Sequence, residues 1–217
     1  MSLKIDSLLL VPRASPPSNP VTGQIYFDTD GSMYAYDGSA WVIFASPFPS
    51  ARVFVATADA TVGNTIDEGT LIGSGVGSLT LPAAFFTVGR TLRIHSSGHH
   101  SATGTATITL RVKLGSVEVL ASAPFYPMSV STKPWSIDTE ITCRSTGASG
   151  TVMAQGVFRY YTESEPDNGE SCFPMGGTTT VTIDTTGTLA VNMTADWGTA
   201  AVGNTITGTN VSLEIMN

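Results

Sequence analysis

The sequence predicts an all-β protein: an antiparallel, jelly-roll-like β-sandwich head that follows a small N-terminal β-meander and an extended arm. Beyond residue 50, several segments alternate between apolar and polar residues, which is typical of strands with one buried face. Two Asp-Gly dipeptides near the N-terminus lie among aromatic and β-favouring residues, a strong hairpin signal. No segment shows the roughly 3.6-residue apolar period of a surface helix.

The head is predicted to span residues 53–217. Its clearest strand signal covers residues 105–114, where every second residue is apolar, and a Gly-Ser turn then leads into a hairpin return over 117–120. About eight to ten strands at spacings of roughly 8–15 residues indicate a two-sheet sandwich and favour a jelly roll. The other period-two series lie at residues 135–143, 152–160, 181–183, 189–193 and 211–215.

Residues 1–23 are predicted to form an extended arm. Four prolines in a polar setting exclude both a helix and an inner strand; they are Pro12, Pro16, Pro17 and Pro20. A proline-rich terminus is mobile unless something holds it, so we expect this arm to lie against a neighbouring protein.

Residues 24–45 are predicted to form a three-stranded meander, followed by a linker at 46–52 that contains Pro47 and Pro49. A meander of this size is too small to be stable alone and must pack on a partner or on another subunit. Its apolar and aromatic residues offer the rigid contact area that interfaces favour: Ile25, Tyr26, Phe27, Tyr34, Tyr36 and Trp41. The alternative is that they form a minor cluster that closes the end of the head.

The composition limits the classes of function. Only 12% of the residues are charged, against roughly 25% in ordinary soluble domains, so the surface is made mostly of Ser, Thr, Gly and Asn. Such surfaces suit extracellular or virion coats. The net charge is −7 with no basic run, which argues against binding to nucleic acid or to an anionic membrane.

Targeting signals and disulfides are not expected. The longest apolar runs are far below the roughly 20 residues of a membrane-spanning helix, and the N-terminus does not resemble a signal peptide. We therefore expect synthesis in a cytoplasm. Cys143 and Cys172 make no disulfide framework, and both thiols are expected to be free, with Cys143 buried as a small hydrophobic residue.

One five-residue sequence occurs twice. Residues 62–66 and 202–206 both read Val-Gly-Asn-Thr-Ile, but their flanking sequences differ, so we interpret the match as chance.

Several phrases resemble phage virion proteins. Residues 20–31 (Pro-Val-Thr-Gly-Gln-Ile-Tyr-Phe-Asp-Thr-Asp-Gly) and 33–41 (Met-Tyr-Ala-Tyr-Asp-Gly-Ser-Ala-Trp) resemble a short module near the N-termini of phage fibre and minor virion proteins. The remainder is similar to phage structural proteins with a compact β head, as in residues 77–82 (Gly-Ser-Leu-Thr-Leu-Pro), 89–94 (Gly-Arg-Thr-Leu-Arg-Ile) and 141–150 (Ile-Thr-Cys-Arg-Ser-Thr-Gly-Ala-Ser-Gly). The resemblance implies a homotrimeric head on the outer surface of a virion, anchored to a capsid or tail protein.

A metal site is the less favoured interpretation of His95, His99 and His100. Their spacing matches no common metal motif, and no Asp, Glu or Cys ligand is placed nearby in sequence, so exposed histidines in a loop or at a strand end are the expected state. Three copies of one histidine could still meet at a symmetry axis.

Enzymatic motifs are absent from the sequence. There is no nucleophile elbow, phosphate loop or dinucleotide fingerprint, and no cofactor is expected. The one acidic cluster, at residues 163–170, is expected to be a solvated loop, because a glycosidase needs two carboxyl groups that flank a cleft.

Three functions therefore remain open: host-surface adhesion by an exposed fibre head, capsid decoration that only stabilises the shell, and, less favoured, a tail-associated glycan hydrolase. Adhesion would use aromatic residues expected to be exposed at the far end of the head, against a bacterial surface glycan or protein; the candidates are Phe125, Tyr126, Tyr160, Tyr161 and Trp197.

Overall fold

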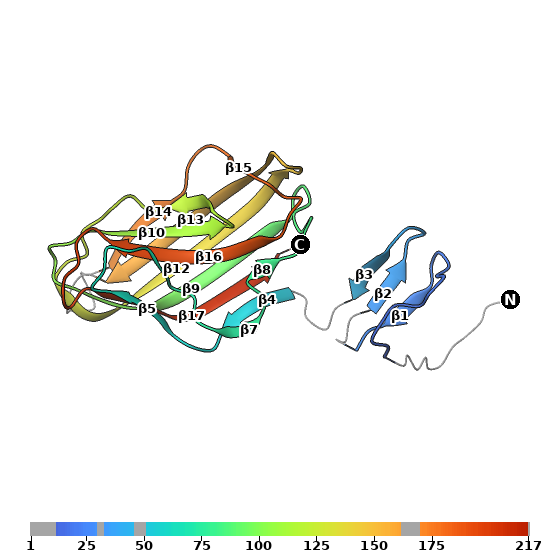
Figure 1. Ribbon diagram of the computed structural model, residues 1–217, viewed down its shortest axis with the longest axis horizontal. Helices are drawn as coiled ribbons and strands as arrows, with labels where there is room; N and C mark the ends of the chain where they lie inside the picture. Colours follow the sequence, from blue (N-terminus) through green and yellow to red (C-terminus); the bar gives the residue numbers. More distant parts are fainter. Residues whose placement is uncertain (1–11, 30–32, 46–50, 162–169, 217) are drawn as a thin grey trace. The chain divides into compact units, whose positions relative to one another are not determined.

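The computed structural model describes residues 12–29, 33–45, 51–161 and 170–216 (Figure 1). They belong to two compact units, divided between Ala51 and Arg52. No helix occurs among these described residues, and neighbouring strands of the sheets run antiparallel. The prediction of an all-β, antiparallel protein is thus confirmed.

The first unit is the predicted three-stranded meander. Its strands are β1 (Ile25–Phe27), β2 (Met33–Tyr36) and β3 (Trp41–Ala45), in the order β1-β2-β3. In the second Asp-Gly turn, the Asp37 carboxylate accepts hydrogen bonds from the backbone N–H groups of Ala40 at 2.7 Å and Ser39 at 2.8 Å. These bonds hold the pKa of Asp37 below its usual value. The first Asp-Gly turn lies outside the described residues.

The predicted arm is described only from Pro12 onward; residues 1–11 lie outside the described residues. Its described part pairs with the meander through the backbone. The Arg13 N–H donates to the Phe27 carbonyl at 2.9 Å, and the Gly23 N–H donates to the Tyr36 carbonyl at 2.8 Å. These residues therefore fold onto their own unit.

The second unit is built from two antiparallel sheets. The large, nine-stranded sheet has the order β14-β13-β12-β9-β17-β4-β7, with β15 paired to β13 and β5 paired to β17. The small, five-stranded sheet has the order β11-β10-β16-β6, with β8 paired to β16. The strands are β4 (Ala51–Ala56), β5 (Ala60–Gly63), β6 (Gly69–Thr70), β7 (Gly75–Gly77), β8 (Thr80–Leu81), β9 (Thr91–Ala102), β10 (Ile108–Leu114), β11 (Val117–Ala121), β12 (Val130–Ser145), β13 (Gly150–Tyr161), β14 (Glu170–Met175), β15 (Val181–Ile183), β16 (Leu189–Trp197) and β17 (Thr205–Ile215).

One hydrophobic core joins the two sheets. Leu110 and Met193 from the small sheet pack in the same core as Ile94, Ile137 and Phe158 from the large sheet. The predicted period-two series lie on the inward faces of their strands, where most of their residues are buried and Gly156, Val181 and Ile215 are partly buried. The gap in the 135–143 series is filled by a polar residue: Thr139 is buried, and its hydroxyl donates to the Ile94 carbonyl at 3.3 Å.

The two Val-Gly-Asn-Thr-Ile segments are neighbours in space. Val62 pairs with Ile206 across β5 and β17, and the Asn64 N–H donates to the Asn204 carbonyl at 3.0 Å. Their conformations differ, however, because Val62 is a buried strand residue whereas Val202 lies in an exposed turn. The two segments are therefore not structural equivalents.

Gly98 allows β9 and β17 to lie close to the Trp135 ring at the centre of the large sheet. A Cβ atom at this position would lie 1.8 Å from the Thr207 carbonyl oxygen and 3.1 Å from the Trp135 ring. The Trp135 indole N–H occupies this site and donates to the carbonyls of Thr207 at 3.1 Å and His99 at 3.2 Å. Only glycine leaves room for this indole between β9 and β17.

We expect Gly98→Ala to destabilise the protein by at least about 3 kcal/mol, because a backbone carbonyl cannot move aside as a side chain can. Gly187→Ala is the matched control, since nothing lies within 4 Å of its added Cβ. Urea denaturation of both variants measures the difference. Equal free energies of unfolding for the two variants would show that the sheet does not require glycine at position 98.

Candidate functional site

The second unit has two distinct ends. At the end that we call proximal, the unit begins at Arg52, whose side chain lies 3.2 Å from Glu214 near the last strand's end. The opposite end, which we call the loop end, holds the segments 64–68, 103–107, 122–129 and 198–204 (Figure 1). A hydrogen bond joins two of these segments: the Thr103 N–H donates to the Asn204 side-chain carbonyl at 2.9 Å.

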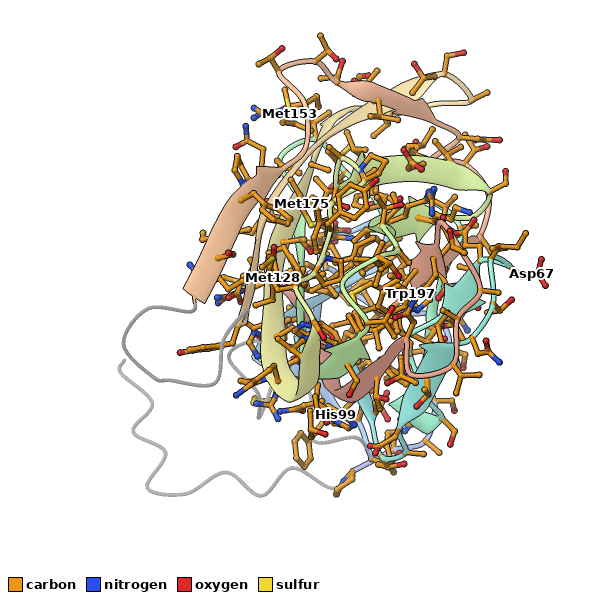
Figure 2. The ribbon with its side chains drawn as sticks, turned by 90° about the vertical axis from the view of Figure 1, so that its left-hand side faces the viewer. Asp67, His99, Met128, Met153, Met175 and Trp197 are labelled. Carbon is orange, nitrogen blue, oxygen red and sulfur yellow. The ribbon has the colours of Figure 1, made fainter. Side chains whose placement is uncertain are left out.

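Four of the exposed apolar side chains of the second unit lie at the loop end. These four protrude from it: Ile66, Tyr126, Met128 and Val202 are 62%, 63%, 57% and 86% exposed. Figure 2 looks onto this end, with Met128 and Asp67 toward its opposite sides and Trp197 in the interior between them. Large apolar side chains that protrude from loops on a rigid scaffold are typical of binding sites.

Phe125 holds the 122–129 loop in place through backbone hydrogen bonds and ring contacts. Phe125 exchanges two backbone hydrogen bonds with Ile108, at 2.8 and 3.1 Å. Its ring packs against Phe173, Tyr160 and Phe158 at centroid distances of 4.7, 5.1 and 5.5 Å. Because Phe125 points inward, its neighbour Tyr126 projects to solvent in a defined position.

The structure corrects the predicted binding residues. Tyr126 is exposed as expected, whereas Phe125 and Tyr161 are half-buried. Tyr160 and Trp197 were expected to be exposed, and this is wrong because both are buried. Tyr160 continues the inward series of β13, and the Trp197 indole donates to the Val62 carbonyl at 3.3 Å.

Sequence reasoning missed three exposed residues of the loop end: Ile66, Met128 and Val202. The available signal was their position in short segments between predicted strands, rich in Gly, Pro and Asn, where an apolar side chain has no strand face to occupy.

The predicted anchoring residues differ in their exposure to solvent. Tyr26 is buried and packs against Trp41 at 4.8 Å and Tyr34 at 5.0 Å, so it forms the unit's own small core rather than a contact surface. Tyr36 also packs on Trp41, at 5.4 Å. Ile25 is exposed, together with Val21 and Val42. Pro12 and Pro16 are exposed, while Pro17, Pro20 and Phe27 are half-buried.

The three histidines do not form one cluster. They lie inside the long strand β9, which corrects the expectation of a loop or strand end, and strand geometry places His95 and His100 on opposite faces. The His95 Nδ1 atom lies 2.8 Å from an Asp138 oxygen. No group of three metal-ligating side chains is found among the described residues.

Both outer faces of the second unit carry ion pairs. On the large sheet, Asp138 lies near His95, Arg159 at 3.5 Å and Arg93 at 3.6 Å. Burial of the carboxyl raises its pKa, but the His95 hydrogen bond and the surrounding cations outweigh this, and the pKa of Asp138 is lowered. On the small sheet, Arg111 pairs with Glu118 and Asp196, and Lys113 pairs with Glu68.

The cysteines agree with expectation: both are free, with Cys143 buried and Cys172 exposed. Burial raises the pKa of the Cys143 thiol, which keeps it protonated and inert. Of the predicted acidic loop, residues 163–169 lie outside the described residues.

Comparisons with family models, curated proteins and solved structures gave no match. In the described part of the chain, no helix is long and apolar enough to cross a membrane.

His100 is a buried base beneath the loop end. Neither of its ring nitrogens makes a hydrogen bond of normal geometry to a described residue, and its ring lies 5.8 Å from that of Tyr160. A cavity of about 10 Å³ beside it is also lined by Phe125, Pro127 and Trp197. Burial lowers the pKa of His100 to about 4 and outweighs the Lys133 backbone, which raises it.

We therefore expect acid to weaken the fold through His100. As the pH falls from 6.5 to about 4, the imidazole is protonated in the unfolded chain but stays neutral in the folded chain. The free energy of unfolding therefore decreases as the pH falls through this window, by up to about 3 kcal/mol. Denaturation at pH 7 and pH 4.5 tests this. His100→Met should lose much less stability between these two values.

The matched control for this experiment is His99→Gln, since His99 is only half-buried and faces away from the core. It should retain the acid sensitivity of the original chain. If His100→Met retains it as well, the buried imidazole is not the cause.

Proposed function

We propose that this chain is a non-enzymatic phage virion protein: a short surface fibre made in the host cytoplasm and carried on the outside of the particle. Its first unit attaches to a capsid or tail protein. Its second unit, a jelly-roll-like head that assembles as a homotrimer, adheres to a glycan or protein of the bacterial surface. The proposal involves no cofactor, nucleic acid or membrane insertion.

The observation that carries this proposal is the difference between the two ends of the second unit. The chain joins the first unit at the proximal end, and the exposed apolar residues Tyr126, Met128, Ile66 and Val202 lie at the opposite end. If the first unit is the anchor, these residues are displayed away from the particle. A site of this size binds weakly, but a trimer in many copies gains strength because later contacts are intramolecular.

Capsid decoration is the second candidate. It needs only attachment, for which the exposed Val21, Ile25 and Val42 of the first unit are suited. A glycan hydrolase is the least favoured candidate. Asp138, on the outer face of the large sheet, does not suit the general acid of such an enzyme, because its pKa is lowered and a general acid needs a raised one.

We expect a chain that lacks residues 1–45 to fold, to scatter light with three times the chain mass, and to be absent from purified particles. The reason is that the second unit has its own core, which contains no residue of the first unit. Virions assembled with the shortened chain, analysed by blotting, give the result. Its presence on virions would refute the anchor, and a monomer at micromolar concentration would refute the trimer.

The double substitution Tyr126→Ser and Met128→Ser should weaken binding of the full chain to host cells at least about tenfold, since apolar anchors carry most of the affinity of a small interface. Flow cytometry with the labelled protein measures this. Val88→Ser is the control, because Val88 is equally exposed but belongs to the proximal end.

Cell-surface polysaccharide incubated with the same protein should keep its chain length. Shortening of the polysaccharide would establish a hydrolase instead. If the double substitution leaves cell binding of the full chain unchanged, adhesion uses another surface.

A further inference from the structure

One face of the three-stranded sheet in the first unit is built from apolar side chains alone. Ile25, Ala35 and Val42 are direct partners across β1, β2 and β3, so they form one row on this face. Side chains alternate along each strand, so Phe27 and Met33 form a second row beside the first. Among the side chains that the structure describes in these strands, none on this face is polar or charged.

The opposite face of the same sheet is already packed. Tyr26 is buried there, with its ring 4.8 Å from that of Trp41 and 5.0 Å from that of Tyr34. The apolar face is more open, because Ile25 and Val42 are each 48% exposed. A sheet of three short strands gains much of its stability from packed faces. The apolar face therefore has the properties of a contact surface.

This face is too small to hold a separate protein by itself. A stable interface buries about 800 Å² on each partner, whereas three of the five side chains, Phe27, Met33 and Ala35, are already half-buried within one chain. Copies of the chain that are joined through their second units do not need such an area. The chain from residue 45 to residue 51 reaches at most about 22 Å, so the first units of a homotrimer stay close together and their contact is intramolecular.

The face also suits contact with its own copy. In a symmetric oligomer the same residues of each copy come together, so a charged side chain there would repel itself. This face presents no such charge. Its exposed row is uneven, because the small Ala35 lies between the larger Ile25 and Val42. A branched side chain of a neighbouring copy can fill the space above Ala35, as close packing requires.

We propose that the apolar face of the first unit packs against the same face of neighbouring copies, so that the first units of a homotrimer share one apolar core. This inference deepens the proposed function and rests on its homotrimer. It gives the trimer a contact in each of its two units. Val21, which is 72% exposed, and the described part of the arm remain available to the particle protein.

Cross-linking of the purified full chain tests this contact. Cys172→Ser removes the exposed native thiol, and Cys143 is buried. In this background we expect Val42→Cys to be joined between chains by a bis-maleimide of about 10 Å, the spacing of packed sheets. Because the linker joins two chains, it can join at most about two thirds of the chains of a trimer. Ser18→Cys is the control, since Ser18 is exposed in the arm and outside the sheet; we expect no cross-link there.

A second substitution tests whether the apolar surface makes the contact. Ile25→Asp, added to Val42→Cys, should lower the cross-linked fraction at least about fivefold, because like charges from each copy would meet. Ser18→Asp in the same background should leave that fraction unchanged.

No cross-link through Val42→Cys, an equal cross-link through Ser18→Cys, or a cross-link that survives Ile25→Asp would overturn the proposal. Protection of the Val42→Cys thiol in virions alone would also overturn it, since the particle protein would then cover the face. The mass of the chain that lacks residues 1–45 reports on the second unit only. Failure of this contact is therefore distinguishable from failure of the trimeric head.

Discussion

The pairing of β9 with β12 and β17 fixes the position of nearly every residue that matters in the second unit. Side chains alternate along a strand, so a slip of one residue would move Leu92 and Ile94 to solvent and bring Arg93 and His95 into the core. The Trp135 indole holds this register, because it fits only where Gly98 leaves the space open. The ion pairs around Asp138 on the outer face depend on the same register, because His95 and Asp138 are direct partners across β9 and β12.

The strands were predictable because their signal is local. Burial against a second sheet demands an apolar residue at every second position, and the series from Trp135 to Cys143 and from Val152 to Tyr160 meets that demand. Tyr160 shares the parity of Val152 and Phe158, so its place in the series conflicts with the expectation that it is exposed. Parity alone would have placed it in the core.

The ion pairs could not be predicted in the same way. Asp138 and His95 are 43 residues apart and meet only because β12 and β9 pair in one register. Each strand shows which of its residues face outward, but a sequence does not state which strands are neighbours. The ion pair between Lys113 and Glu68 was hidden for the same reason. Long-range pairing therefore sets where the few charges of this chain meet.

The two ends of the second unit's chain lie side by side. Arg52 contacts Glu214, and the Met216 N–H donates to the Thr91 carbonyl at 3.0 Å, both at the proximal end. Adjacent termini make a domain tolerant of circular permutation, since a short bridge can join them without distorting a strand. They also mean that both ends of the unit's described chain lie away from Tyr126 and Met128.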